Sequence, residues 1–357
     1  MKILFLRPRA ELGGASRHML ALATALAERG HAVTLGTGGG EWRDQFAHPV
    51  SLPLYPSTAR NLIASIGQTT QVTHREKIDV IHSHHRFTTI VGRAVARLTG
   101  LPLVCTVHEF KTDARWLSRL WIAPWVCAIS DALRDHLIQF YGVNPACVTV
   151  TRIGALPTLP DPSAADRLRH ALSDAPSGPI LGYVGRLSPE KGVATLIYAL
   201  PQVLQAHPTA RVVIIGDGIE RRVLETLATS LGLGDQVCFM GEQVDAPQLM
   251  TAMDVVVVPS LSEGFGLTAV EAMAAAKPVV ASAVGGLVEV VEDGVTGFLV
   301  PPTDPVALSG RIIEVLANPA RAVAMGAAGQ KKVAEWTPAQ AAEITEALYR
   351  RALANHA

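Results

Sequence analysis

Residues 254–271 read DVVVVPSLSEGFGLTAVE and carry the clearest structural signal in the chain. The four consecutive valines predict a buried parallel strand, and the segment after Gly266 has the composition of a helix. Gly264 and Gly266 free the backbone between them, so N–H groups at the start of that helix can approach a phosphate closely. A strand, a glycine-marked loop and a helix in this order predict a phosphate-binding α/β unit.

The same alternation of short apolar runs and longer helical patterns extends along the whole chain. The strands predicted in the first half are Lys2–Leu6, Ala32–Thr37, Asp79–His82, Leu103–His108, Trp125–Ile129 and Val148–Thr151. Those predicted in the second half are Ile180–Val184, Arg211–Ile215, Gln236–Met240, Asp254–Val258 and Pro278–Ala281. A proline-rich stretch, Ile153–Gly178, separates the two series and predicts the connection between two domains.

A length of 357 residues fits two domains of ordinary size. We predict an α/β fold in which two facing, doubly wound Rossmann-like domains, residues 1–158 and 159–335, leave a cleft between them. Ligands of such domains bind at the carboxyl ends of the strands, so the cleft is the expected site. Residues 336–357 include the amphipathic segment Pro338–Ala354 and are expected to form a helix that packs back toward the first domain.

The charge distribution narrows the range of partners. The chain holds 31 Lys and Arg against 31 Asp and Glu, which argues against a nucleic-acid binder. Residues 1–158 hold 17 of the basic and 10 of the acidic residues, a net charge of +7, and the remainder carries −7. The basic first domain predicts either an ordinary solvated surface or an attraction to an anionic acceptor or a membrane.

The expected location is cytoplasmic. No run of about 18 apolar residues predicts a membrane span, and the chain begins with a predicted strand rather than a leader. The four cysteines lack metal-type spacing and are expected to be reduced thiols. Arg115–Trp121 mixes basic and aromatic residues, so it is either a buried helix face or an interfacial helix at the inner face of a membrane.

A second glycine-marked loop, Gly185–Gly192, follows the predicted strand Ile180–Val184 and contains Arg186 and Lys191. A guanidinium and an ammonium beside one strand end suit a diphosphate. The spacing differs from that of a Walker loop, which argues against ATP hydrolysis. A third loop, Gly13–Gly14 after the first strand, fits either a phosphate or sugar contact or a simple tight turn.

Three side chains beside these loops are candidates for contacts with a sugar. Glu263 precedes the predicted helix, at the mouth where a donor sugar would lie. Glu271 lies one turn into that helix, where it can accept hydrogen bonds from two ribose hydroxyls. His108 ends a predicted strand, and it is either a sugar contact or a structural histidine with satisfied hydrogen bonds.

The chain resembles the family 4 retaining glycosyltransferases of GT-B architecture over nearly its whole length. The segments that carry the resemblance are Gly13–Gly14, Asp79–His84, Thr106–Glu109, Ile129–Asp131, Gly185–Gly192, Gly216–Gly218, Val237–Gly241, Ser260–Glu271 and Gly285–Pro301. Only Ser260–Glu271 is specific by itself, but the set as a whole is highly specific. One departure is Arg152-Ile153-Gly154, where the family often has an Asn-Gly pair, and it concerns the hinge and any donor contact made there.

The resemblance implies that the first domain binds the acceptor and the second binds a nucleotide-sugar donor. The implied donor-binding residues are Gly14, Gly185, Arg186, Lys191, Met240, Gly264, Phe265, Gly266, Leu267 and Glu271, and the implied catalytic residues are His108, Glu263, Arg186 and Lys191. In this scheme Arg186 and Lys191 hold the diphosphate, Glu271 holds the ribose, and the backbone near Met240 meets the nucleobase. Glu263 and His108 contact the transferred sugar.

The implied activity is hexosyl transfer from a UDP-sugar to an acceptor hydroxyl with retention of anomeric configuration, in glycan or cell-envelope biosynthesis. The acceptor stays open, with an anionic or lipid-linked molecule among the candidates. An epimerase of the same architecture, acting on the nucleotide sugar alone, is the alternative. A nucleotide-sugar-binding protein without turnover is disfavoured by Glu263 beside two cations, and an NAD-dependent dehydrogenase by the absence of Gly-x-Gly-x-x-Gly after the first strand.

No metal or other cofactor is expected. The sequence has no Asp-x-Asp pair for a donor-bound cation, and the clustered His82, His84 and His85 lack a fourth ligand at a recognisable spacing. The protein itself must then stabilise the departing diphosphate, and Arg186, Lys191 and the helix start at Gly266 are the expected groups.

Overall fold

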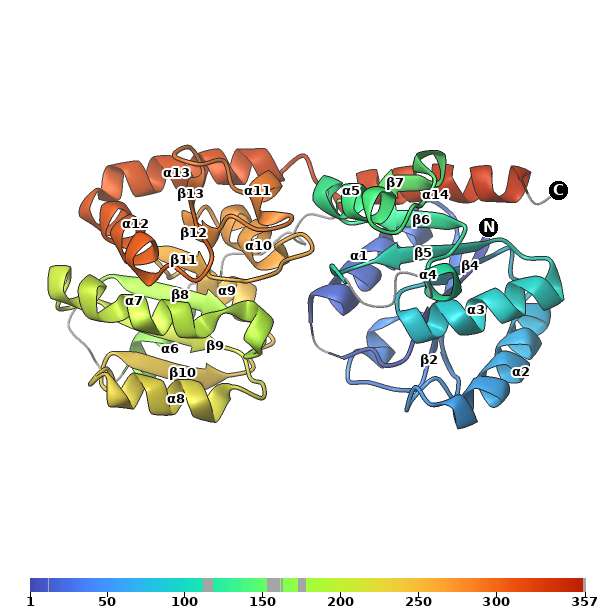
Figure 1. Ribbon diagram of the computed structural model, residues 1–357, viewed down its shortest axis with the longest axis horizontal. Helices are drawn as coiled ribbons and strands as arrows, with labels where there is room; N and C mark the ends of the chain where they lie inside the picture. Colours follow the sequence, from blue (N-terminus) through green and yellow to red (C-terminus); the bar gives the residue numbers. More distant parts are fainter. Residues whose placement is uncertain (12, 112–117, 153–160, 162, 173–177, 356–357) are drawn as a thin grey trace. The chain divides into compact units, whose positions relative to one another are not determined.

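The computed structural model describes the chain except for residues 12, 112–117, 153–160, 162, 173–177 and 356–357. The chain forms two compact units, Met1–Ile153 together with Trp336–Ala357, and Gly154–Glu335. Each unit contains one parallel sheet with helices on both faces (Figure 1). The predicted α/β class with two Rossmann-like sheets is confirmed, while the predicted domain boundary after Thr158 lies outside the described residues.

The sheet of the first unit has seven strands in the order β3-β2-β1-β4-β5-β6-β7. Their bounds are β1 (Lys2–Arg7), β2 (Ala32–Thr37), β3 (Pro49–Ser51), β4 (Val80–Ser83), β5 (Leu103–Val107), β6 (Trp125–Ala128) and β7 (Val148–Val150). Because β1 pairs with both β2 and β4, the strand order reverses direction between β1 and β4. In open α/β sheets such a reversal opens a crevice at the carboxyl ends of the strands.

Helices cover both faces of this sheet. One face packs against α1 (Gly14–Glu28) and α14 (Pro338–Ala354), and the other against α2 (Ala59–Glu76) and α3 (Arg86–Thr99). Two shorter helices, α4 (Ser118–Trp121) and α5 (Asp131–Gln139), flank β6. The last helix, α14, returns to the first unit after the second is complete, and its buried Tyr349 belongs to the first unit's core.

The sheet of the second unit has six strands in the order β10-β9-β8-β11-β12-β13. Their bounds are β8 (Ile180–Val184), β9 (Arg211–Ile215), β10 (Val237–Gly241), β11 (Val255–Val258), β12 (Val279–Ser282) and β13 (Gly297–Val300). The helices are α6 (Ala164–Ala171), α7 (Val193–Ala206), α8 (Arg221–Ser230), α9 (Ala246–Met250), α10 (Leu267–Ala274), α11 (Leu287–Val290), α12 (Pro305–Ala317) and α13 (Pro319–Val333). Here the order reverses between β8 and β11, which places the crevice beside the loops that follow these two strands.

All predicted strands exist, and their ends differ from the prediction by one residue at most. Ser83, for example, extends β4 because it continues the pairing with Leu6 and Cys105. Two strands at sheet edges were not predicted, β3 and β13. The first has only three residues and begins with a proline, and the second begins with Gly297. Within the described residues, no helix has the length and apolar character needed to span a membrane.

Candidate functional site

In the second unit, the loops after β8 and β11 are joined to each other. The Leu261 amide donates a hydrogen bond to the Glu190 carbonyl at 2.8 Å. Gly192, at φ 61°, lies so close to the other loop that a Cβ there would sit 2.2 Å from the Pro259 carbonyl oxygen. Backbone contact at this distance is open only to glycine. The two loops therefore form one surface at the reversal point of the sheet.

Two predicted residues meet on this surface. The ammonium of Lys191 lies 2.7 Å from Oε2 of Glu263, and the Ser260 hydroxyl donates to the same oxygen at 3.2 Å. The Lys191 and Glu263 side chains are 23% and 16% exposed, so the pair is partly shielded from water yet still open on one side. A partly shielded ion pair is stronger than a surface pair, because less solvent screens it. The residue predicted to hold the diphosphate is thus neutralised by the residue predicted to contact the sugar.

Arg186 supplies a second cation at the same edge of the sheet. The buried Tyr183 hydroxyl donates a hydrogen bond to the main-chain carbonyl of Arg186 at 2.9 Å, which fixes the turn after β8. The Arg186 side chain is exposed and makes no hydrogen bond or ion pair with any residue in the described part of the chain. Its guanidinium is free to engage an anionic ligand.

The start of α10 completes this edge. Gly266 precedes the helix at φ 98° and contributes no side-chain acceptor to the N–H groups of the first turn. Gly264 and Phe265 are buried. The Glu263 carbonyl accepts a hydrogen bond from the Gly286 amide at 3.0 Å, which fastens this loop to the segment after β12. A helix start whose N-cap residue offers its amides no side-chain acceptor suits a phosphate. Glu271 lies one turn further along the helix and is 8% exposed.

The predicted base contact lies at the end of β10. The Met240 carbonyl accepts a hydrogen bond from the side-chain amide (Nε2) of Gln243 at 2.9 Å, and Met240 is partly exposed. The roles predicted for Met240, Glu271 and Gly264 to Leu267 stay predictions. Met240 lies at the carboxyl end of β10, and the other residues belong to the loop after β11 and to α10 in the same unit.

The remaining predicted residues, Gly14 and His108, belong to the first unit. Gly14 is the first residue of α1, and His108 directly follows β5. At Arg152, where the chain departs from the family pattern, the guanidinium forms an ion pair with Asp131 at the start of α5, while residues 153 and 154 lie outside the described residues. Of the segment Arg115–Trp121, residues 115–117 lie outside the described residues, and Ser118–Trp121 form α4, in which Trp121 is buried.

Four histidines gather at the carboxyl end of the first unit's sheet. Nδ1 of His84, which follows β4, lies 3.3 Å from Nε2 of His108. His18 of α1 stands edge-on to His108 with ring centroids 5.0 Å apart. His82, within β4, stacks on His84 at 4.3 Å. Among the described residues, no group of three or more His, Cys, Asp or Glu is arranged to hold a metal ion.

These histidines are neutral at neutral pH. Burial, aided by the charge of Arg7, lowers the pKa of His18 to about 4. Burial, aided by His18, lowers the pKa of His82 to about 3. The pKa values of His84 and His108 lie well below the usual 6.5, first through burial and then through the neighbouring histidines and Arg7. Neutral imidazoles can both donate and accept, which matches the chemistry of hydroxyl groups.

His18 and His84 were not predicted as site residues. His18 falls within the predicted helix, one turn before Leu22 and beside Met19 on its apolar stripe. Its position on a helix face that otherwise points to the core could have indicated a site residue, because a buried polar group needs a hydrogen-bonding partner. His84 was considered as a metal ligand and as part of the segment Asp79–His84, but it was given no role in the site.

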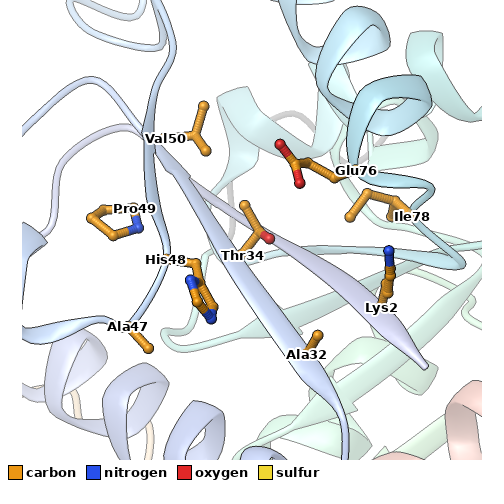
Figure 2. Close-up of a pocket in the computed structure, with 9 residues that line it drawn as sticks. All are labelled: Lys2, Ala32, Thr34, Ala47, His48, Pro49, Val50, Glu76 and Ile78. Atoms are coloured by element: carbon orange, nitrogen blue, oxygen red, sulfur yellow. The ribbon is translucent and has the colours of Figure 1, made fainter.

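A pocket of about 480 Å³ lies elsewhere in the first unit. Figure 2 shows its lining, which is Lys2, Ala32, Thr34, Ala47, His48, Pro49, Val50, Glu76 and Ile78. Several of these residues begin strands, so the pocket lies toward the amino ends of β1, β2 and β3. It contains none of the predicted site residues, and ligands of doubly wound sheets bind at the opposite ends of the strands.

Comparison with known proteins gives two matching family models. The model described as Glycosyltransferase Family 4 matches residues 12–154, and the model described as Glycosyl transferases group 1 matches residues 166–332. A D-inositol 3-phosphate glycosyltransferase of Frankia alni is 37% identical over 294 residues, which cover 72% of this chain and 71% of its own. The glycosyltransferase MJ1607 of Methanocaldococcus jannaschii is 28% identical over 336 residues, which cover 86% of each chain.

A solved structure shows the same architecture. Alr3699/HepE of Anabaena, in complex with UDP and glucose, matches with a TM-score of 0.86 and 28% identity over 98% of this chain and 99% of its own. The likeness covers both units and confirms the predicted GT-B fold class.

Proposed function

Because this chain belongs to glycosyltransferase family 4, we propose that it transfers a hexosyl unit from a UDP-sugar to an acceptor hydroxyl without a metal ion. The observation that carries the proposal is the contact between Lys191 and Glu263 beside the uncapped start of α10. This arrangement offers a cation and amide donors to a diphosphate, next to a carboxylate that can accept hydrogen bonds from a sugar. The Anabaena relative, solved with UDP and with UDP-glucose, supports the choice of donor.

In this proposal, the protein neutralises the leaving group. When the bond between the anomeric carbon and the β-phosphate oxygen breaks, negative charge grows on the diphosphate. Arg186, Lys191 and the first-turn amides of α10 are placed to stabilise that charge. Such preorganised groups act more strongly on the transition state than on the bound donor, and each contributes about 3–4 kcal/mol.

The other residues hold the rest of the donor. Glu271 accepts hydrogen bonds from two ribose hydroxyls, and the backbone near Met240 meets the uracil. Glu263 and His108 contact hydroxyls of the transferred sugar. The contacts with the ribose and the uracil exist in the bound donor and in the transition state alike, so they set donor affinity more than the rate of bond breaking. The contacts with the transferred sugar lie beside the bond that breaks, so they act on the rate as well.

We propose retention of anomeric configuration. The acceptor oxygen attacks the anomeric carbon from the face that the diphosphate leaves, and the acceptor proton passes to the departing phosphate oxygen. The bond to the phosphate breaks as the bond to the acceptor forms, and no further reactant is needed. The support for this step is membership of the family, since the positions of single residues do not fix the stereochemistry.

The test begins with a thermal-shift panel of nucleoside diphosphates and nucleotide sugars in the presence of EDTA. We expect UDP and one UDP-sugar to raise the melting temperature under these conditions. An acceptor library with that donor then yields a product whose anomeric configuration is determined by NMR. An inverted product refutes retention, and loss of turnover on chelation refutes metal independence. Conversion of the UDP-sugar to an isomer without acceptor would instead support the epimerase.

A further inference from the structure

The contact between His84 and His108 joins a buried side chain to the histidine proposed to touch the sugar. His84 is 2% exposed, whereas His108 is only partly buried. Nδ1 of His84 and Nε2 of His108 are 3.3 Å apart, so one of them donates a hydrogen to the other. Since both imidazoles are neutral, each ring carries one N–H, and the direction of this hydrogen bond fixes both tautomers.

The other nitrogen of His84 shows which way the bond runs. His84 Nε2 is buried and has no hydrogen-bond partner among the residues that the structure describes. If Nε2 carried the proton, an N–H donor would be stranded in the protein interior, which is rarer and costlier than an unused lone pair. Nδ1 of His84 therefore holds the proton and donates to Nε2 of His108. His108 must then carry its own proton on Nδ1.

The ring of His84 is itself held in place. It stacks on His82 at 4.3 Å and packs against Phe5 at 4.7 Å. His82 is immobilised in turn, because its Nδ1 lies 2.5 Å from the Tyr349 hydroxyl and its Nε2 lies 2.8 Å from the Thr106 hydroxyl. With both nitrogens engaged inside the protein, His82 is structural. In His84, by contrast, only Nδ1 has a hydrogen-bond partner among the described residues, and that partner is His108.

We infer that His84 is a positioning residue, which orients the His108 ring and fixes it as the Nδ1–H tautomer, so that His108 presents an N–H donor to a hydroxyl of the transferred sugar. This inference rests on the proposed contact between His108 and that sugar. Partners that fix the tautomer and orientation of a metal-bound imidazole typically contribute about 10- to 100-fold to activity, and we expect an effect of this size for the His108 ring. His18, edge-on to His108, adds only packing to the same ring.

Two substitutions separate hydrogen bonding from packing at this position. His84→Phe keeps a ring that can pack on His82 and Phe5 but cannot donate. His84→Asn loses the ring but offers an amide N–H near the place of Nδ1. The control is His74→Phe, because His74 is exposed on α2, away from the sheet edge. The first readout is the tautomer of His108, determined by ¹⁵N NMR of histidine-labelled protein without ligand, and the second is steady-state kinetics with the UDP-sugar.

We expect the wild-type protein to show His108 as Nδ1–H, His84→Phe to shift it toward Nε2–H, and His84→Asn to restore it. In the kinetics, His84→Phe should lower kcat by about 10- to 100-fold with the donor KM within about twofold, and His84→Asn should recover most of the loss. An unchanged tautomer in His84→Phe, or an equal loss in both variants, would overturn the inference. Full activity in His108→Ala would instead overturn the proposed sugar contact. The NMR measurement would still show whether His84 fixes the tautomer of His108, because it needs no ligand.

Discussion

The ammonium of Lys191 lies 2.7 Å from the Glu263 carboxylate, although the two residues are 72 positions apart in the sequence. One side chain comes from the loop after β8 and the other from the loop after β11, and the Leu261 amide ties these loops together. The cation proposed for the diphosphate is therefore paired before any donor arrives. A donor must compete with Glu263 for Lys191, and this competition gives the site its first two tests.

Replacing Lys191 with methionine should slow the reaction far more than it harms the fold. The variant keeps the length of the side chain but removes the charge that faces the leaving diphosphate, so we expect kcat to fall about 10²- to 10³-fold. Arg186→Met should act in the same direction, and Lys331→Met, on the exposed side of α13, is the control. Steady-state kinetics at saturating donor gives the result. Wild-type kcat in both site variants would remove the electrostatic basis of the proposed mechanism.

Glu263→Gln should have opposite effects on binding and turnover. Without the carboxylate, Lys191 is free for the diphosphate, so UDP should bind about fivefold tighter, or about 1 kcal/mol. Turnover should nevertheless fall, because the proposed acceptor of sugar hydroxyls is lost. Isothermal titration with UDP measures the first effect, with Glu292→Gln as an exposed control in the same unit. Weaker UDP binding would show that Glu263 mainly holds Lys191 in position.

Glu271 offers a test in which the donor itself is changed. Glu271→Gln should raise the donor KM about tenfold with kcat nearly unchanged, because a ribose contact stabilises the bound donor and the transition state equally. With the wild-type enzyme, a 2′-deoxyribose donor should also have a KM about tenfold higher than the normal donor. With Glu271→Gln, replacing the normal donor by the 2′-deoxyribose donor should raise KM little further. If the two losses simply add, Glu271 does not contact the ribose 2′-hydroxyl.

The backbone of the site could be predicted from the sequence, whereas its side-chain pairing could not. Runs such as 255–258 define buried strands, and glycines at 185, 264 and 266 mark the loops that follow them. The contact of Lys191 with Glu263 depends on how two loops from different strands lie against each other, and a linear pattern does not encode that distance.

The histidine cluster shows the same limit more sharply. The sequence placed His108 at a strand end, but the residue that holds it follows a neighbouring strand. Parallel pairing of β4 with β5 brings the two strand ends together. Tyr349, which engages His82, comes from the last helix of the chain. Contacts of such long sequence separation arise only from the finished topology, so composition and periodicity could not reveal them.

A substitution at Gly192 tests the contact between the loops after β8 and β11 through the free energy of unfolding, which can be measured without a ligand. A Cβ at this position would lie 2.2 Å from the Pro259 carbonyl oxygen, and φ is 61°. Gly192→Ala should therefore destabilise the protein by about 2–3 kcal/mol and also weaken UDP binding. The matched control is Gly310→Ala in α12, where a Cβ meets no atom within 4 Å. That variant should stabilise by about 0.5–1 kcal/mol. The free energies of unfolding come from urea titration, and equal signs for the two variants would contradict the packing argument.

Glu346 ties the returning helix α14 to the first unit and gives stability a defined dependence on pH. Hydrogen bonds from Arg350 and then from Arg29, with Nε2 of His31 3.3 Å away, lower its pKa from 4.5 to about 2. The folded state thus favours the ionised carboxylate, and the resulting stabilisation is fully present above pH 4.5 and is lost as the pH falls toward 2. Because other carboxyl groups titrate in this range, the measured quantity is the difference in free energy of unfolding between the wild type and Glu346→Gln. That difference should be about 2 kcal/mol at neutral pH and should shrink steadily below pH 4.5. A difference that stays constant down to pH 3 would mean that the carboxylate charge contributes nothing to holding α14 in place.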